Sequence, residues 1–432
     1  MSLSPTQLEV LDKIEAWHKK AEACSGFKDA DSPQVFKLMG YAGTGKTTLA
    51  KELLNRIDGQ INFAAYTGKA ASVLAKKGCV GAQTIHSLIY LVQEKGKSGL
   101  KDLEQVLADT KKKLSDIDIL PPPTPLAQDF GQFDKQALKE RLTRDIVSME
   151  LQLENEKKTL GRPSFVLNPE SLVRNASLIV LDEVSMVAQD MGEDLMSFGV
   201  PILVIGDPAQ LPPVFGNGFF VQGKPDVLLT EIHRQAQDNP LIQLASKVRE
   251  EKPLRPGSYG PNKVLLEGEK LDEDVLNFDQ ILVGKNTTRK MMNARIREIM
   301  GFKEWHPIPG DKLICLKNDK ELGLQNGTLW KVLQLGNVDE HRITITIADD
   351  SGYEIPVEIH AAPFLGKEIP FYEKSEAHEF DFGYAITVHK SQGSQWEKVL
   401  LCDESFCFKQ NRFKWLYTGL TRASERVTVL QL

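Results

Sequence analysis

Largely apolar runs, each followed by a short polar turn, recur along the chain and predict buried strands. Four of them lie at residues 35–39, 61–65, 177–181 and 201–205. Residues 4–23 have helical apolar spacing, and helix-like segments at 47–57 and 70–77 follow the first two runs. This alternation predicts an α/β sheet of parallel strands, with functional loops at the C-terminal ends of the strands.

The second half of the chain repeats the alternation of apolar runs and helix-like segments. Residues 280–284 form another apolar run, the helix-like segment 288–300 follows, and 426–430 is a terminal strand. We therefore expect a second α/β domain. Between its two parts, Asn326-Gly327 is a hairpin signal and residues 342–347 alternate as a half-buried strand does, which predicts a small β module.

Residues 91–170 interrupt the first sheet. Two amphipathic helices, separated by a proline-rich break at 121–125, are expected there. Their apolar positions are Leu103, Val106, Leu107 and Leu114 in the first helix, and Leu138, Leu142, Ile146, Met149 and Leu153 in the second. We interpret the stretch as a largely helical inserted subdomain.

Composition narrows the class of protein only slightly. The 432 residues are 41% hydrophobic and 26% charged, as in ordinary globular chains, and five scattered cysteines form no metal-binding pair. No apolar run reaches membrane-spanning length and no signal peptide is evident, so we expect a cytoplasmic protein. The net charge of −6 argues against a uniformly basic surface, but not against a basic channel within an acidic whole.

The chain is organised around residues 40–48, where Gly40 to Thr47 fit the pattern G-x-x-x-x-G-K-[ST] at every fixed position. Glycines let successive backbone N–H groups wrap a phosphate. Lys46 would reach the β and γ phosphates, and the Thr47 hydroxyl would bind Mg²⁺. The motif predicts a nucleoside triphosphate, ATP, as ligand. The expected contacts are Gly40, Ala42, Gly43, Thr44, Gly45, Lys46, Thr47 and Thr48.

Asp182 and Glu183 follow the third apolar run and form the second half of the predicted nucleotide site. Asp182 would hold Mg²⁺ opposite Thr47. Glu183 would orient and deprotonate the attacking water, which is the task of a general base in a hydrolase.

A further loop, Gly206 to Val214, begins at the end of the fourth apolar run and therefore lies on the same sheet edge. Gln210 carries both a donor and an acceptor, so it can sense the γ-phosphate. Arg234 and Arg422 are candidate arginine fingers, and a guanidinium in that role is worth about 10³–10⁵ in rate. We include both arginines with Lys46, Glu183 and Gln210 among the candidate catalytic residues.

Small, hydroxyl and basic residues cluster in three loops suited to contact phosphates and sugars without reading bases. The candidates for these contacts are Thr67 and Lys69, His86, and Thr387, His389 and Lys390. Taken alone, a histidine such as His86 or His389 is more often structural than functional.

In this order the motifs resemble those of superfamily 1 helicases, specifically the RecD-like and Dda-like 5′-to-3′ group, superfamily 1B. Residues 40–47, 66–71 and 84–87 are similar to motifs I, Ia and Ib. Asp182 to Ser185 are similar to motif II and Gly206 to Val214 to motif III. His389 to Gly393 and Tyr417 to Arg422 are similar to motifs V and VI.

The resemblance implies two RecA-like P-loop NTPase domains with ATP between them, a helical insert called 1B and an SH3-like β module called 2B. The expected bounds are 1–90 with 171–238 for the first motor domain, 91–170 for 1B, 239–304 with 376–432 for the second motor domain, and 305–375 for 2B. It also implies that Gln7 reads the adenine. Single-stranded DNA would pass over both domains beside the candidate loops.

The implied activity is ATP-dependent 5′-to-3′ translocation on single-stranded DNA and unwinding of duplexes, in replication or repair. The implied partners are single-stranded DNA and its junctions with duplex, with a single-strand binding protein or replisome component as a candidate protein partner. We expect a monomeric motor without a membrane role, encoded by a bacterium or a phage.

Several alternatives stay open. A translocase that displaces proteins or anneals strands, and an RNA-directed helicase, would carry the same motifs. A P-loop kinase or nucleotide switch would not need Gln210 and the two arginines, and a non-enzymatic single-strand binding module would not need Glu183. The insert departs from the Dda-like pattern and is a wedge or a partner-docking arm; Phe130 and Phe133 are wedge candidates, although core packing suits both better.

Overall fold

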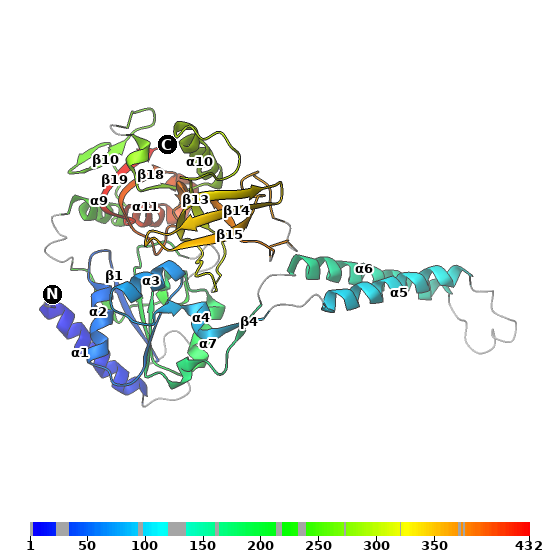
Figure 1. Ribbon diagram of the computed structural model, residues 1–432. Coiled ribbons are helices and arrows are strands. Elements are labelled where there is room, and N and C mark those ends of the chain that lie inside the picture. The colour runs from blue at the N-terminus through cyan, green and yellow to red at the C-terminus, as the bar shows by residue number, and fades with distance from the viewer. Residues whose placement is uncertain are drawn as a thin grey trace. The chain divides into compact units, whose positions relative to one another are not determined.

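Figure 1 shows the chain as a computed structural model, which describes residues 3–22, 34–93, 98–119, 135–159, 164–212, 218–231, 239–271, 274–319, 321–369, 373–374 and 376–432. It divides into two compact units. The first comprises Met1–Leu91, Leu167–Gly366 and Glu379–Leu432, and the second comprises Val92–Val166 with Lys367–His378. No helix in the described ranges is long and apolar enough to cross a bilayer.

An all-parallel sheet of six strands carries the first set of motifs. Its order is β3 (Gln83–Thr84), β2 (Ile61–Ala65), β6 (Leu178–Asp182), β7 (Ile202–Gly206), β1 (Val35–Gly40) and β8 (Val227–Leu229). The four apolar runs are confirmed as strands. Their largely apolar composition suits strands that are covered on both faces. Leu38 of β1, Val180 of β6 and Leu203 of β7 are fully buried in the hydrophobic core.

Five helices accompany this sheet (Figure 1). They are α1 (Pro5–Glu22), α2 (Lys46–Glu52), α3 (Gly68–Lys76), α4 (Ile85–Ile89) and α7 (Gln189–Ser197). The parallel register brings the C-terminal ends of the strands to one edge of the sheet, since Ala65 pairs with Asp182 and Met39 pairs with Gly206. The loops that follow β1, β2, β6 and β7 therefore share the C-terminal edge of the sheet.

A second six-stranded sheet uses the later motifs. Its order is β17 (Ala385–Thr387), β11 (Gln280–Val283), β18 (Trp396–Asp403), β19 (Ala423–Gln431), β10 (Asn262–Leu265) and β9 (Gly257–Tyr259), with only β9 antiparallel. Helices α9 (Pro240–Arg249), α10 (Asn286–Ile299) and α11 (Arg412–Leu420) belong to it. The expected strand and helix at 280–284 and 288–300 are present, whereas β9 and β10 were not predicted.

A separate antiparallel sheet corresponds to the predicted β module. Its order is β15 (Glu354–His360), β14 (Arg342–Ala348), β13 (Leu329–Val338), β12 (Lys312–Cys315) and β16 (Phe380–Phe382). Alternation in β14 buries Ile343, Ile345 and Ile347. The predicted turn at Asn326-Gly327 precedes β13, and Gly327 has a φ of 88°. Strand β16 extends this sheet beyond residue 375.

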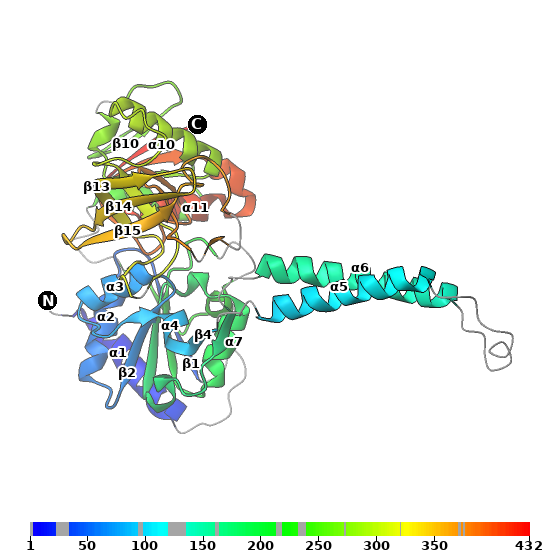
Figure 2. The same cartoon turned by 45° about the vertical axis from the view of Figure 1, so that its right-hand side comes forward.

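Two long helices, α5 (Ser98–Ile119) and α6 (Lys135–Thr159), occupy the insert and lie side by side (Figures 1 and 2). Leu107 and Ile146 are buried and Lys111 forms a 2.6 Å ion pair with Glu150, so an apolar contact is edged by charge. A two-stranded sheet of β4 (Tyr90–Gln93) and β5 (Ser164–Leu167) is present at the ends of the insert. The prolines at 121–125, Phe130 and Phe133 lie outside the described residues.

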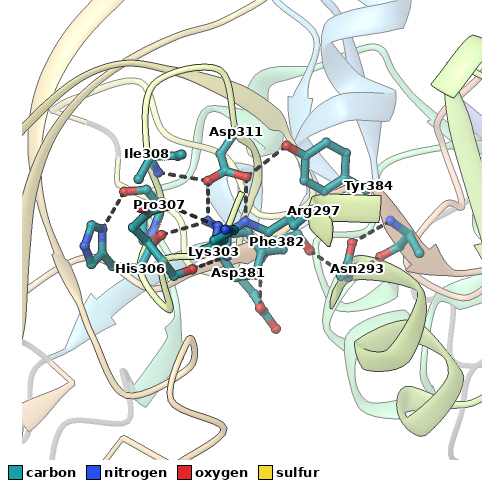
Figure 3. A network of polar contacts seen from close by, with 12 residues as sticks. Asn293, Arg297, Lys303, His306, Pro307, Ile308, Asp311, Asp381, Phe382 and Tyr384 are labelled. Carbon is teal, nitrogen blue, oxygen red and sulfur yellow. Dashed lines mark hydrogen bonds and ion pairs between the residues drawn. The ribbon is translucent and has the colours of Figure 1, made fainter. Parts of the chain in front are cut away.

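A buried ion pair ties α10 to the antiparallel sheet (Figure 3). Arg297 Nε and Nη2 donate to the two carboxylate oxygens of Asp311 at 2.9 and 3.0 Å. Tyr384 donates its hydroxyl to Asp311 Oδ1 at 2.9 Å, and the Arg297 guanidinium lies 4.2 Å from the centre of the Phe382 ring. Removal of one charged member would destabilise the fold, because the remaining buried charge would lack its partner.

Glu404 has a comparable structural role at the start of α10. Its Oε2 accepts from the backbone N–H groups of Gly284 and Lys285, both at 2.8 Å, and its Oε1 accepts from Thr288 Oγ1 at 2.6 Å. Burial alone would raise the pKa of Glu404, but the hydrogen bonds from Thr288, Lys285 and Gly284 outweigh it and hold the pKa below the usual range. The ionised carboxylate therefore stabilises the folded second domain.

We expect Glu404→Gln to lower the free energy of unfolding by about 2–4 kcal/mol at pH 7, since it weakens several charge-assisted hydrogen bonds. A depressed folded pKa gives stability that is present above the unfolded pKa of about 4.3 and is lost as pH falls through the folded pKa. The thermal midpoints of the parent and the variant should therefore approach each other progressively as the pH falls below about 4.3. A difference that stays constant from pH 7 to pH 3 would contradict this role.

Candidate active site

The phosphate loop links β1 to α2 with the backbone that its glycines allow. Gly43 and Gly45 have φ angles of 79° and 78°, a left-handed region that other residues enter only under strain. A Cβ at Gly40 would lie 2.7 Å from Thr44 Oγ1 and 2.9 Å from Leu229 Cβ, so a side chain there would push the loop off β8. These positions explain why the sequence needs glycine at 40, 43 and 45.

Lys46 opens α2 and its side chain turns back over the loop. Its Nζ donates to the carbonyl oxygens of Gly40 at 2.7 Å and Tyr41 at 3.0 Å. Thr47 and Thr48 follow in the first turn of α2, Thr47 partly buried and Thr48 exposed, while Thr44 is buried and donates to Tyr41 O at 2.9 Å. The ammonium group therefore lies where a polyphosphate in this loop would meet it.

Asp182 and Glu183 stand at the end of β6, as predicted. Burial raises the pKa of both carboxyl groups, and the positive charge of Lys46 opposes the shift in each. Glu183 also has φ 56° and ψ 40°, a left-handed conformation that costs about 1–3 kcal/mol for a non-glycine residue and is frequent at active sites. The backbone thus holds the Glu183 carboxyl group in a desolvated position suited to a general base.

Arg422 reaches this site from the second sheet. Its positive charge is the largest influence that opposes the effect of burial on Glu183. Arg422 is itself buried, and it donates to the carbonyl oxygens of Thr418 and Ser394, each at 3.1 Å. Carbonyl oxygens leave the guanidinium charge uncompensated, so its field acts on Glu183. Arg234, the other candidate finger, lies outside the described residues.

Gln210 lies beyond the end of β7 and is buried. In the part of the chain that the structure describes, its side-chain Oε1 has no hydrogen-bond partner. A buried amide oxygen without a partner is costly, and a group bound at this edge of the sheet could satisfy it. This observation agrees with the predicted sensor role.

Tyr417 was not singled out from the sequence beyond its place in the segment 417–422. Its hydroxyl donates to Asp207 Oδ2 at 2.8 Å and accepts from the backbone N–H of Ala42 at 3.0 Å. One residue along α11, Thr418 Oγ1 accepts from the N–H of Leu211 at 3.0 Å. Helix α11 therefore contacts both the phosphate loop and the 207–211 segment.

A cavity of about 140 Å³ lies beside the phosphate loop, lined by Tyr41, Ala42 and Gly43 on one side and by α9 and α11 on the other. Arg249 of α9 contributes a guanidinium whose carbon is 3.8 Å from the centre of the Tyr41 ring. Arg249 was also not predicted, because one arginine at the end of an amphipathic helix carries no distinguishing signal.

Gln7 lies at the start of α1 and is buried. Its N–H donates to Ser4 Oγ at 3.2 Å, and its Oε1 accepts from the N–H of Ser4 at 3.0 Å. This reciprocal pair is a capping box, which the spacing Ser-x-x-Gln could have indicated. The structure thus gives Gln7 a helix-capping contact, and its role in reading adenine stays a prediction.

The residues fit a nucleotide with its magnesium ion by the chemistry of their donors. The Thr47 hydroxyl and the Asp182 carboxylate are hard oxygen ligands, which Mg²⁺ prefers. Within the described ranges no group of three or more His, Cys, Asp or Glu side chains could hold a metal.

The candidate nucleic-acid contacts of the first sheet lie after β2 and β3. Thr67 caps α3 by accepting from the N–H of Ala70 at 3.2 Å, and Lys69 Nζ lies 4.8 Å from the centre of the Trp396 ring. His86 packs edge-on against Tyr66, and burial lowers its pKa. Thr67 and His86 thus have structural contacts, and their role in binding nucleic acid stays a prediction.

Those of the second sheet follow β17. Thr387 is buried, His389 packs 5.3 Å from the Phe408 ring centre, and Lys390 is exposed. A Cβ at Gly393 would lie 2.8 Å from Thr67 Oγ1, so the two candidate loops touch at that glycine. Both sheets therefore contribute, in one region, residues that we expect to contact a strand of nucleic acid.

The site combines a phosphate loop after one strand of a parallel sheet, an acidic pair at the end of another strand of that sheet, and an arginine from a second sheet. These features define the class of protein. The chain is a P-loop nucleotide-binding protein with two RecA-like sheets. Comparison with known proteins identifies its family.

The family model described as AAA domain matches residues 28–259, more than half of the chain, and the model described as UvrD-like helicase C-terminal domain matches residues 382–430. The chain therefore belongs to the AAA domain family, and the expected resemblance to superfamily 1B helicases of the RecD type is confirmed.

Among curated relatives, the ATP-dependent RecD2 DNA helicase of Deinococcus radiodurans is 27% identical over 58% of this chain and 35% of its own length. The conjugal transfer protein TraA of Agrobacterium fabrum is 27% identical over 52% of this chain and 22% of its own length. The chain thus spans about a third or less of these two proteins. The ATP-dependent DNA helicase Pif1 of Bdellovibrio bacteriovorus is 24% identical over 98% of this chain and 86% of its own length.

Among solved structures, Bacteroides Pif1 bound to single-stranded DNA matches with a TM-score of 0.53, at 19% identity, over 99% of this chain and 92% of that one. This similarity confirms the fold of two RecA-like domains.

Proposed function

We propose that the chain is an ATP-dependent DNA helicase that moves 5′ to 3′ on single-stranded DNA and unwinds duplexes ahead of it. The observation that carries the proposal is the convergence of charge at Glu183. The first sheet supplies Lys46 and the second supplies Arg422, and the positive charges of both lower the pKa of the same half-buried carboxyl group. Hydrolysis that needs residues from two sheets is thereby tied to how those sheets are arranged.

The chemical roles follow from the positions. Glu183 accepts a proton from the attacking water, while Lys46 and Arg422 stabilise charge that develops on the transferring phosphoryl group. The Gln210 amide oxygen can accept a hydrogen bond from that water, and its amide NH2 group can donate to the phosphate and so sense it. A magnesium ion held by Thr47 and Asp182 would neutralise charge on the phosphate oxygens.

The step from hydrolysis to movement uses the loops after β2 and β17. Thr67, Lys69 and His86 belong to one sheet and Thr387, His389 and Lys390 to the other, so a change in the separation of the sheets alternates the grip of each on a strand. The Bacteroides Pif1 structure was solved with single-stranded DNA, which supports DNA as the partner. A single-strand binding protein or replisome component remains our candidate protein partner.

We also propose that the domain bounds are those that the sequence predicts. Helices α5 and α6 would then form domain 1B, and the five-stranded antiparallel sheet would form an SH3-like domain 2B that helps to hold the strand. We propose that the α5–α6 pair serves as a wedge or as a docking arm for a partner.

Two matched duplexes, one with a 5′ and one with a 3′ single-stranded tail, test the function. We expect ATP-dependent unwinding of the 5′-tailed duplex alone. A strict preference for the 3′ tail would keep the helicase and overturn the polarity.

ATPase activity without nucleic acid, with DNA and with RNA separates the rivals. Stronger stimulation by RNA would favour an RNA-directed helicase, and indifference to both would favour a nucleotide switch. DNA-stimulated hydrolysis without unwinding of either duplex would indicate a translocase.

A further inference from the structure

We propose that Tyr417 is a positioning residue that couples the phosphate loop to the DNA-contacting loop after β17. The inference rests on the proposed function, because it names the contact through which hydrolysis and DNA binding influence each other. It concerns a hydroxyl group that neither reacts nor contacts DNA.

The polarity of the two hydrogen bonds of Tyr417 is unambiguous. The backbone N–H of Ala42 can only donate, so it occupies a lone pair of the hydroxyl oxygen at 3.0 Å. The single hydroxyl proton must then go to Asp207 Oδ2, at 2.8 Å. Burial and, after it, the negative charge of Asp207 raise the pKa of Tyr417, so the hydroxyl keeps this proton.

The bridge is dry and short. Tyr417 is 2% exposed and Asp207 is 3% exposed, so water cannot replace a lost partner without rearrangement. The other carboxylate oxygen, Asp207 Oδ1, accepts from the N–H of Ala209 at 3.0 Å. A displacement of the phosphate loop at Ala42 must therefore break a buried hydrogen bond or move the carboxylate that shapes the 207–211 segment.

The far end of that segment continues toward the DNA-contacting loop. The N–H of Leu211 donates to Thr418 Oγ1 at 3.0 Å, and its carbonyl oxygen accepts from Gln392 Nε2 at 3.2 Å. Gln392 lies in the loop that carries His389 and Lys390. Four polar contacts, with the backbone from Ala209 to Leu211 between the third and the fourth, thus join Ala42 of the phosphate loop to Gln392, and Tyr417 is the member that touches the nucleotide side.

The alternative is that Tyr417 only stabilises the fold, and Tyr384 is a matched control for it. Tyr384 immediately precedes β17 of the second sheet, and it also donates its hydroxyl to a buried carboxylate, that of Asp311, at 2.9 Å (Figure 3). The surroundings of Tyr384 raise its pKa as well, with burial first and Asp311 second. Its partner Asp311, together with Arg297, which binds Asp311, lies in the structural network of α10.

The test compares Tyr417→Phe and Tyr384→Phe in the full chain, since both changes remove one hydroxyl that donates to a buried carboxylate and keep the ring. The measurements are kcat and KM for ATP with and without a poly(dT) single strand, and the thermal midpoint. We expect Tyr417→Phe to reduce the stimulation of kcat by DNA at least about 5-fold, the lower end of typical coupling between sites. The KM for ATP without DNA should change less than about 2-fold, since uniform binding is retained.

Tyr384→Phe should lower the thermal midpoint comparably and leave the stimulation ratio unchanged. Asp207→Asn combined with Tyr417→Phe should reduce stimulation no further than Tyr417→Phe alone, because the two groups act as one unit. Stimulation that survives in Tyr417→Phe, or falls equally in both tyrosine variants, would overturn the inference. Absence of stimulation in the parent chain would overturn the proposed function as well.

Discussion

Glu183→Gln should bind ATP with nearly parental affinity and lose about 10²–10⁴-fold in kcat, the usual contribution of a general base. The amide has the shape of the carboxyl group but accepts no proton from water. The backbone at Glu183 is strained in a left-handed conformation, and the substitution leaves that conformation unchanged. Binding of a fluorescent ATP analogue and steady-state hydrolysis measure the two quantities separately.

Glu193→Gln is the matched control for this substitution. Glu193 lies exposed on α7 of the same sheet, where its Oε1 accepts from Gln189 at 2.8 Å. The same chemical change there should leave kcat at the parental level. Turnover by Glu183→Gln at the parental rate would show that another group activates the water.

Arg422→Ala should slow hydrolysis by about 10³-fold or more, as expected for an arginine that stabilises phosphoryl transfer, while DNA affinity stays nearly parental. The guanidinium is buried, its hydrogen-bond partners are carbonyl oxygens, and its charge opposes the effect of burial on Glu183. Arg422→Lys should recover only part of the rate, because an ammonium group keeps the charge but not the fork of donors.

Loss of structure is the competing explanation for a slow Arg422 variant, and Arg297→Ala tests it. Arg297 is equally buried and also donates to carbonyl oxygens, those of Glu304 and His306. It belongs to the network of Figure 3, so its removal should lower the thermal midpoint and leave kcat of the folded fraction unchanged. Equal losses of kcat in the two alanine variants would remove Arg422 from the catalytic site.

The strands were predictable because local sequence carries their signal. Runs such as Ile202 to Ile205 are apolar at every position, and a strand covered on both faces needs that composition. Strands β9 and β10 are short and mixed, and β10 owes its place to pairing with β19, more than 150 residues later. A pairing of that range leaves no periodic trace near Asn262.

The phosphate loop and the acidic pair were found for a similar reason, since each motif is contiguous and each residue type has a chemical task. Tyr417 and Arg249 escaped because their partners are distant in sequence: Asp207 for one and Tyr41 for the other. Gln7 illustrates the opposite case, because its contacts in the structure follow a local capping pattern that the sequence shows, whereas the role that the resemblance implies stays a prediction.

The strand orders of the two sheets also bear on how the chain folds as it is synthesised. Every strand of the first sheet has been made by Leu229, whereas β19 lies between β18 and β10 and is the last strand of the second sheet in chain order. The phosphate-loop domain can thus mature on the ribosome while β9, β10, β11, β17 and β18 wait for the strand that unites them. During that interval the apolar edges of β18 and β10 lack their partner, so chaperone engagement is expected at this stage and at these edges.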